Sequence, residues 1–344
     1  MKPYADLTRL GRLRRLRKLA QLALREYDLP GAELKFLHYQ GNLIFRADLP
    51  ELPAEPVTGP FLPDRFNLRI LTMNDPEAIR AELLWLTAIR QGTGLPVPEP
   101  VPNRSGELLT EIMTPGVPQG RVVSLMRWVD GRHRGKNIPA QHVRAFGRLV
   151  AQLHKFAASW QPPPGFKRFH WDYDGLFGKH GELGGTPVAE LVAAMPDQYR
   201  QPFVSVSTQI RQMMDAFGKQ PDAYGMIHAD LYPDNLLFKA GEPRIIDFED
   251  CGFGYWMYDL GTALSPWAWR DQWPQMRAAF LDGYAEIRQL PEAQLQHLDL
   301  FIAAQFAVMV LWATLFIQQD PAMRAVHEAW LHKDGARMLE YFDR

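Results

Sequence analysis

The sequence predicts an α+β protein in which an antiparallel β-sheet forms early in the chain and helices make up most of the later part. Three observations support this fold class. Apolar and polar residues alternate in short runs between residues 34 and 71, as in strands with one buried face. Helical patterns continue from residue 259 to the end of the sequence. At 344 residues, the chain has room for two lobes that each bury a core.

The most informative stretch, residues 224–259, brings polar side chains to the ends of short apolar runs. In order, these polar residues are His228, Asp230, Asn235 and Asp247. A Gly-Glu-Pro turn at residues 241–243 precedes the apolar run that ends at Asp247. Carboxylate and amide oxygens are the ligands that Mg²⁺ takes when nucleotide phosphates complete its shell. The stretch therefore indicates a site rather than a core.

The order and spacing of these residues resemble the catalytic and metal-binding motifs of the protein-kinase-like fold. The segments HADLYPDNLLF, IIDFED and YDLGTAL are similar to those of the aminoglycoside phosphotransferase family, which includes homoserine-, choline- and stress-response-type kinases. The resemblance implies a two-lobed fold that uses ATP and Mg²⁺. It implies that Asp230 is the catalytic base and that Asn235 and Asp247 bind Mg²⁺. His228 and Asp259 would brace the catalytic loop. The alternative, acids that only cap turns, is disfavoured by four matches in order and spacing.

Composition argues against several other classes of protein. The formal net charge is −1, so nothing in the charge balance calls for nucleic acid or an anionic membrane as a partner. The single cysteine, Cys251, excludes a disulfide framework and suits the reducing cytoplasm, where we expect the protein to act. We expect Cys251 to be a buried thiol without a chemical role.

Residues 7–27 are expected to form a leucine-rich, basic helix. Leucines recur at every third position from Leu10 to Leu22, and six basic residues lie within residues 9–18. The pattern is also compatible with a targeting peptide or a membrane-surface helix. Because it lacks a continuous apolar region and a cleavage site, we favour a helix that packs on the small lobe with its basic face in solvent.

Strands expected at residues 34–39 and 43–48 flank a turn that contains Gly41 and Asn42. In the kinase-like fold this turn covers the nucleotide phosphates, so the resemblance places Gly41 and Asn42 among the nucleotide-binding residues. A plain hairpin turn fits equally well. Residues 50–63 contain five prolines and cannot form a central strand, so we expect an elongated hairpin loop.

Residues 66–71 alternate as a strand and carry Arg69 where kinase-like enzymes have a lysine that holds the α- and β-phosphates. An arginine keeps the charge but has a different geometry. A helix is expected to start at Pro76, after the N-cap Asp75, and Glu82 falls on its apolar stripe. A buried acid needs a partner, and Arg69 is the candidate. The alternative is that Glu82 lies in solvent.

Two further strands are expected at residues 107–112 and 121–129, after a loop at residues 95–102, and they complete a five-stranded sheet. The resemblance identifies the end of the last strand as the hinge between the lobes. There the carbonyl of Arg127 and the amide of Val129 would bind adenine, and Met126 would line its pocket. The resemblance thus divides the chain into a nucleotide-binding lobe, residues 1–127, and a catalytic and substrate-binding lobe, residues 128–344.

In the second lobe, Pro139 opens a long helix that carries His154 near its apolar stripe. We expect His154 to be a structural residue rather than a ligand. Residues 300–317 are apolar enough to reach transmembrane length. Because no other segment does so and its flanks are not basic, we favour a helix buried in the core of the lobe.

These residues predict ATP- and Mg²⁺-dependent transfer of a phosphoryl group to a hydroxyl of a small molecule. Acids and aromatic rings near the expected acceptor site favour a cationic amino alcohol or amino sugar, bound through charge and cation–π contacts. The residues concerned are Trp171, Asp172, Tyr173, Glu249 and Asp250. The alternative is that the rings are core and the acids cap turns. We expect no nucleic acid or membrane partner.

Three other functions are compatible with parts of the sequence. A bacterial stress-response-type Ser/Thr protein kinase shares the motifs, although the near-neutral composition disfavours it mildly. A nucleotide-binding pseudokinase scaffold would explain Arg69, but a scaffold does not need Asp230, Asn235 and Asp247 together. A metal-dependent hydrolase using His228 would need more metal ligands than this stretch offers.

Overall fold

The computed structural model describes residues 2–40, 42–54, 56–71, 75–135, 137–178 and 182–343. The chain folds into two compact units. Unit 1 comprises Met1–Arg132, Gly165–Lys167 and Arg244–Glu249, and unit 2 comprises His133–Pro164, Arg168–Pro243 and Asp250–Arg344. The sequence predicted a single division after residue 127, whereas in the structure two short later segments belong to unit 1.

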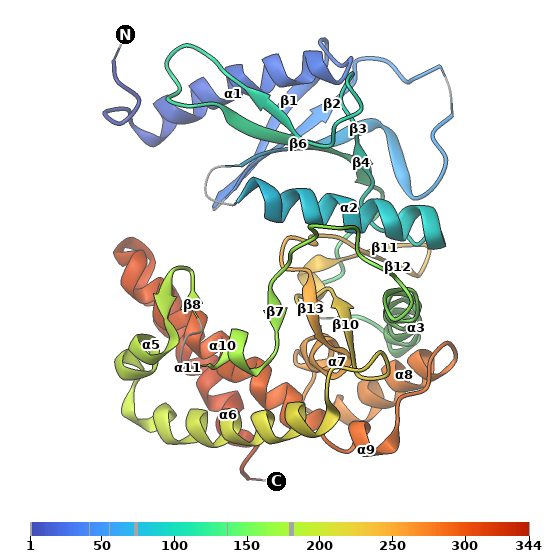
Figure 1. Cartoon of the computed structure of the whole chain (residues 1–344), viewed down its shortest axis with the longest axis vertical. Coiled ribbons are helices and arrows are strands. Elements are labelled where there is room, and N and C mark those ends of the chain that lie inside the picture. Colours follow the sequence, from blue (N-terminus) through green and yellow to red (C-terminus); the bar gives the residue numbers. More distant parts are fainter. Residues whose placement is uncertain are drawn as a thin grey trace. The chain divides into compact units, whose positions relative to one another are not determined.

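Among the described residues, unit 1 contains one six-stranded antiparallel sheet (Figure 1). Its strands are β1 (Glu33–Gln40), β2 (Asn42–Asp48), β3 (Phe61–Ile70), β4 (Pro100–Val101), β5 (Thr110–Ile112) and β6 (Arg121–Val129). Five strands were predicted, and β4 lies in the stretch that was predicted to be a loop. The sequence did not predict β4 because two residues are too few to show alternation. Its proline also argued against a strand, although proline is tolerated at a sheet edge. The carbonyl of Glu99 accepts a hydrogen bond from the amide of Arg127 over 2.9 Å and holds this edge in place.

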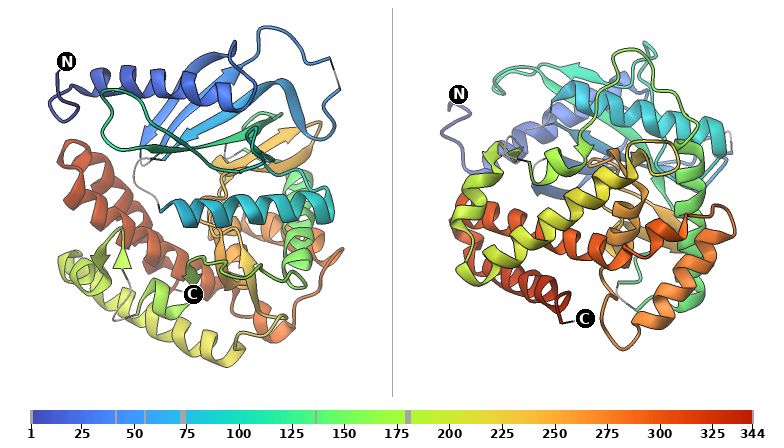
Figure 2. Two further views of the ribbon diagram at one scale, coloured as in Figure 1. Left: turned by 45° about the horizontal axis from the view of Figure 1, so that its top comes forward. Right: turned by 60° about the horizontal axis from the view of Figure 1, so that its bottom comes forward.

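Helix α1 (Arg9–Glu26) covers one face of the sheet (Figure 2). Its Leu16, Leu19 and Leu24 are buried in one core cluster with residues of the strands. Its arginines are not all left in solvent. The guanidinium groups of Arg9, Arg15 and Arg17 donate to the backbone carbonyls of Tyr39, Gly116 and Leu34. The prediction of a helix packed on the small lobe is confirmed, and part of its basic face binds its own unit.

The proline-rich segment ends earlier than the sequence predicted, because β3 begins at Phe61. The register of β3 against β6 shifts between Phe61 and Phe66, and Pro63 lies in this irregular part. A bulge accommodates a residue that cannot donate to the ladder. On the other side of the sheet, α2 (Pro76–Thr93) begins after Asp75, whose carboxylate accepts from the amide of Glu77 over 3.0 Å.

Unit 2 is mainly helical. Its long helices are α3 (Ala140–Ala157), α6 (Asp197–Phe217), α7 (Trp256–Leu264), α8 (Trp273–Ala285), α10 (Leu298–Gln319) and α11 (Arg324–Glu340). A small sheet has the order β10 (Tyr224–Ile227), β13 (Gly252–Tyr255), β7 (His170–Trp171). The short elements are α4 (Tyr173–Leu176), β8 (Glu182–Leu183), β9 (Thr186–Pro187), α5 (Val188–Ala194), a 3₁₀ turn (Pro233–Asn235), β11 (Leu236–Lys239) and α9 (Glu292–Leu295). Strand β12 (Glu242–Ile245) begins in unit 2, and its last two residues belong to unit 1. The α+β class is confirmed.

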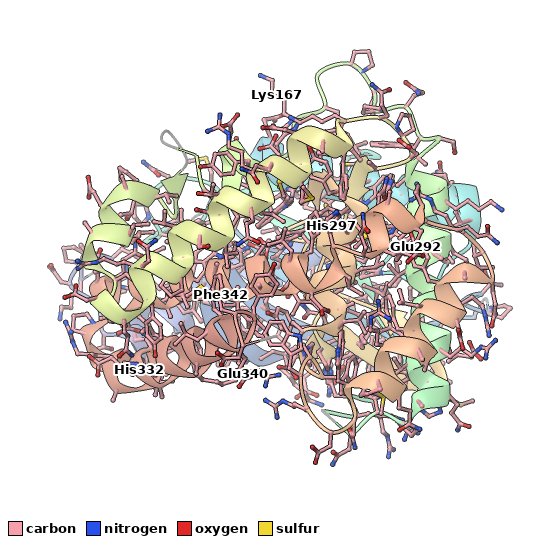
Figure 3. All side chains as sticks on the ribbon, turned by 90° about the horizontal axis from the view of Figure 1, so that it is seen from below. Lys167, Glu292, His297, His332, Glu340 and Phe342 are labelled. Carbon is pink, nitrogen blue, oxygen red and sulfur yellow. The ribbon has the colours of Figure 1, made fainter. Side chains whose placement is uncertain are left out.

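Of the helices in the described part of the chain, α10 alone is long and apolar enough to cross a membrane, and 78% of that window is buried inside the protein. It packs against α6, α7 and α11. In turn α6 is joined to α11 where the hydroxyl of Tyr199 lies 3.1 Å from Nδ1 of His332, a residue labelled in Figure 3. The prediction of a core helix at residues 300–317 is confirmed.

Candidate active site

Arg69 lies on β3 and forms a buried ion pair with Glu82 of α2. Nη2 of Arg69 lies 2.9 Å from Oε2 of Glu82, and both side chains are almost fully buried. Nε of Arg69 also donates to the hydroxyl of Ser124, its neighbour on β6, over 3.3 Å. Burial alone would lower the pKa of Arg69, but Glu82, then Glu249 and Asp247, raise it above its ordinary value. The pair expected from the sequence is therefore present, and the cation is fixed in place.

Glu249 brings the segment after β12 to the same part of unit 1. Its Oε2 lies 3.8 Å from Nη1 of Arg69, and its Oε1 accepts from Nδ2 of Asn42 over 2.7 Å. Asn42, the first residue of β2, is buried. Gly41, predicted to bind phosphate, lies outside the described residues. Asn42, Arg69 and Glu249 thus form one polar cluster, and the charge of Asp247 also acts on Arg69. The contact of Glu249 with the acceptor stays a prediction.

The residues predicted to bind adenine lie at the end of β6; they are Met126, Arg127 and Val129. Directly after them, the amide of Asp130 donates to the carbonyl of Pro60 over 2.8 Å. Nη1 of Arg244 donates to the same carbonyl over 2.7 Å and to the carbonyl of Asp130 over 2.8 Å. The end of the proline-rich segment therefore braces the backbone that follows the predicted hinge.

In unit 2, β10 delivers the catalytic-loop residues predicted from the sequence. His228 is fully buried, and its Nδ1 accepts from the amide of Asp230 over 3.2 Å. Ala229 has φ +70°, a conformation that costs a non-glycine residue about 1–2 kcal/mol. The carboxylate of Asp259 holds this turn by accepting from the amides of His228, over 2.9 Å, and Ala229, over 2.7 Å. Such strain is typical of functional loops that the surrounding structure fixes.

Asp259 is itself held by a histidine that the sequence marked only as structural. Nε2 of His154 lies 3.0 Å from Oδ2 of Asp259, and Nδ1 of His154 lies 2.9 Å from the hydroxyl of Tyr284. Burial lowers the pKa of His154, and Asp259 opposes the change only in part. A neutral imidazole that donates from Nε2 and accepts at Nδ1 satisfies both contacts. His154 was not predicted to act on the catalytic loop, because no spacing links residue 154 to residue 259.

Asn235 fixes the carboxylate of Asp230. Nδ2 of Asn235 donates to Oδ2 of Asp230 over 2.6 Å and to its backbone carbonyl over 2.9 Å. With the amide nitrogen so used, the amide oxygen of Asn235 is the atom suited to a metal. Asp247, with φ +63°, supplies a carboxylate. Within the described residues, no three His, Cys, Asp or Glu side chains gather into a metal site. The binding of Mg²⁺ by Asn235 and Asp247 stays a prediction.

Three of the other predicted acceptor residues, Trp171, Asp172 and Tyr173, make structural contacts. Trp171 is buried, stacks on Tyr258 with ring centroids 5.7 Å apart, and donates from Nε1 to the carbonyl of Asp250 over 2.8 Å. Asp172 caps α4, accepting from the amide of Gly175 over 3.0 Å, and its other oxygen lies 2.7 Å from Nζ of Lys219. The ring of Tyr173 lies under the guanidinium of Arg211. The burial of Trp171 and the capping by Asp172 are what the alternative expects, and the role of these residues in binding the acceptor stays a prediction.

Comparisons with known proteins identify the family and the fold of this chain. A family model described as the phosphotransferase enzyme family matches residues 64–296. A homoserine kinase from Gluconobacter oxydans (strain 621H) is 27% identical over 234 residues, which are 65% of this chain and 68% of that protein. The solved structure of the microcompartment-associated aminopropanol kinase is 26% identical, with a TM-score of 0.71 over 94% of this chain and 99% of that chain. Amicoumacin kinase hAmiN, solved with AMP-PNP, Ca²⁺ and Ami, is 19% identical, with a TM-score of 0.72 over 95% of each chain.

These likenesses confirm the kinase-like fold and the family that the motifs predicted. The aminopropanol kinase aligns over nearly its whole length, so the shared fold includes both units. The family match spans more than half of the chain and contains the loop from His228 to Asn235 as well as Asp247. The chain is therefore an enzyme of phosphoryl transfer and belongs to the phosphotransferase enzyme family.

Proposed function

We propose that this protein transfers the γ-phosphoryl group of ATP to a hydroxyl group of a small molecule, with Mg²⁺ as the metal. The observation that carries the proposal is the fixed carboxylate of Asp230, which Asn235 holds at 2.6 Å on a loop braced by Asp259. A general base must be held at a defined position before it can accept a proton from an alcohol.

In the reaction, the acceptor oxygen forms a bond to the γ-phosphorus while the bond from that phosphorus to the β–γ bridging oxygen breaks. The hydroxyl proton goes to Asp230, and ADP leaves. Asp230 orients the hydroxyl, with His228 positioning its backbone. Mg²⁺, held by Asn235 and Asp247, would offset charge on the phosphates. Alignment and charge neutralisation supply most of the acceleration in this type of chemistry.

The nucleotide is assigned to residues of unit 1. Arg69 would contact the phosphates, and Glu82 would hold its side chain. Gly41 and Asn42 would cover the phosphates. The backbone at Arg127 and Val129, with Met126, would bind adenine. The raised pKa of Arg69 supports a permanent cation at this position, and its fork of donors suits phosphate oxygens.

We propose a cationic amino alcohol or amino sugar as the acceptor. The aminopropanol kinase, which acts on an amino alcohol by its printed name, shares 26% identity with this chain over nearly its whole length. Curated relatives are homoserine kinases, whose named substrate also carries an amine and a hydroxyl. We propose that the enzyme acts in the cytoplasm without a nucleic acid or membrane partner.

An ADP-release assay on the purified protein tests the proposal. It compares amino alcohols, homoserine, sugars, an aminoglycoside and a generic protein substrate, each with ATP and Mg²⁺. We expect release with a small amine-bearing alcohol, and loss of that release in Asp230→Asn. Phosphorylation of the protein substrate alone would show a Ser/Thr protein kinase. Binding of ATP without ADP release from any acceptor would contradict the proposal and favour a nucleotide-binding scaffold.

A further inference from the structure

A pocket of about 290 Å³ lies in unit 2, away from the residues assigned above except for Asp250. Its walls come from α10 and α11, which lie side by side (Figures 1 and 2), and from the loop before β13. The residues that matter are Met309, Trp312 and Phe316 on α10, Trp330 and Asp334 on α11, and Asp250 on the loop. Four large apolar side chains and two carboxylates therefore surround one small space.

Where α10 lines the pocket, its side chains are less buried than along most of the helix. Met309, Trp312 and Phe316 follow one another at intervals of three and four residues, so they form one stripe of the helix. These three remain partly exposed, although most of the helix around them is buried. Trp330 and Asp334, four residues apart on α11, form the facing stripe, and Trp330 is 45% exposed.

Hydrogen bonding fixes α10 to the catalytic loop. Nε2 of Gln305, one turn before Met309, donates to the hydroxyl of Tyr232 over 3.1 Å, and Tyr232 lies two residues after Asp230. The amide oxygen of Gln305 accepts from the hydroxyl of Thr262 over 3.2 Å, so the bridge is held at both ends. The wall of the pocket is thus positioned relative to the proposed base by a short chain of contacts inside one unit.

We infer that this pocket binds the phosphoryl acceptor and selects a small amino alcohol without a carboxylate, an inference that rests on the proposed function. The ammonium group would lie beside Asp334 and Asp250 with the ring of Trp330 as a further contact, and the carbon chain would pack on Met309 and Phe316. The hydroxyl would then point toward Asp230, which takes its proton as the oxygen–phosphorus bond forms and the bond to ADP breaks.

Two features set the selectivity. The described lining includes no arginine, lysine or histidine that could bind a carboxylate of the acceptor, and Asp250 and Asp334 would repel such a group. Asp334 does have an ion pair with Lys333 at 3.2 Å, but the side chain of Lys333 is 56% exposed and the pair is therefore weak. The volume, about 290 Å³, lies at the lower limit of ligand pockets and suits a small acceptor better than a multi-ring amino sugar.

The first test compares kcat/KM for 1-amino-2-propanol, propane-1,2-diol and homoserine. The aminopropanol is expected to exceed both others by at least about 10-fold, the effect of one charged hydrogen bond. Asp334→Asn should lower the preference for aminopropanol over the diol by about 10- to 100-fold. Trp330→Leu, at an exposed position, should lower it by about 3- to 30-fold. The ratio of two substrates cancels a general loss of active protein.

Glu328→Gln is the matched control, because Glu328 lies on α11 with its side chain 48% exposed and outside the pocket. It should leave the preference unchanged. The inference would be overturned if the enzyme preferred homoserine, if kcat/KM did not depend on the charge of the acceptor, or if the Glu328 and Asp334 variants had equal effects. The kinase assignment would remain intact in each case.

A second measurement does not depend on phosphoryl transfer. Calorimetry of 1-amino-2-propanol with the nucleotide-free protein should show binding that is lost in Asp334→Asn and kept in Glu328→Gln. This result would support the pocket even if no acceptor released ADP, in which case only the proposed function would fail. Absent binding, or equal binding by both variants, would overturn the inference.

Discussion

The amide of Ala229 donates to Oδ1 of Asp259 over 2.7 Å while Ala229 adopts φ +70°. A residue at the end of β10 is therefore kept in a left-handed conformation by a carboxylate from α7. His154 and Tyr284 fix that carboxylate from α3 and α8. The position of Asp230, one residue further on, depends on this network. Four segments that are distant in sequence thus determine where the proposed base lies.

Replacing Asp259 by asparagine should both destabilise the protein and slow it. The amide group presents an NH₂ where two backbone amides need acceptors, so we expect a loss of about 3 kcal/mol in the free energy of unfolding. Displacement of Asp230 should lower turnover by about 10²-fold. Denaturant unfolding and steady-state kinetics measure the two effects. Ala229→Gly is the control, because glycine takes positive φ without strain, and it should unfold no more readily than the wild type.

Arg69→Ala should weaken binding of ATP far more than binding of adenosine, because only ATP has phosphates for the guanidinium to contact. Glu82→Gln should show the same pattern more weakly, since Arg69 would lose its fixed orientation. Calorimetric titration of both ligands measures the difference. The control is Arg80→Ala on α2, the helix that carries Glu82. The side chain of Arg80 is 42% exposed, so its loss should leave the binding of both ligands unchanged. Equal losses for ATP and adenosine would mean that unit 1 is destabilised and that Arg69 does not contact phosphate.

Asp230→Asn and Asp247→Asn should distinguish the role of the catalytic base from the role of the metal ligand. Loss of the base should lower turnover by about 10²–10⁴-fold while ATP binding stays near that of the wild type. Loss of Asp247 should remove Mg²⁺-dependent turnover, as chelation of Mg²⁺ does in the wild type. Turnover and ATP affinity, each titrated with Mg²⁺, distinguish the two variants. Wild-type turnover in Asp230→Asn would show that the base is elsewhere.

The stability of the protein should fall as the pH drops below 6.5, the ordinary pKa of histidine. Burial lowers the pKa of His154 in the folded state, so the unfolded chain binds more protons in this window. The contribution of neutral His154 to stability is present above pH 6.5, and it is lost as the pH falls from 6.5 through the lowered pKa of the folded state. His154→Gln keeps a donor toward Asp259 but does not titrate. Its unfolding free energy should change less between about pH 7 and pH 5 than that of the wild type, and equal slopes would exclude His154 as the source.

Sequence reasoning was sufficient where the relevant residues are close in the chain or obey a simple physical requirement. The spacing of His228, Asp230 and Asn235 identified the family, because one short loop carries all three. Asp75 marked the start of α2 through its capping chemistry. The pair between Arg69 and Glu82 could be predicted across thirteen positions because a buried acid requires a cation.

What only the tertiary structure decided are the contacts between elements far apart in the chain. The bond from His154 to Asp259 spans 105 positions, and the bond from Asn42 to Glu249 spans 207. The stripes of α10 and α11 can be read from their spacing, but the pocket exists only because those stripes face each other beside Asp250. Periodicity reports which side of an element is buried. It does not report which partner buries it, because that depends on how the whole chain packs.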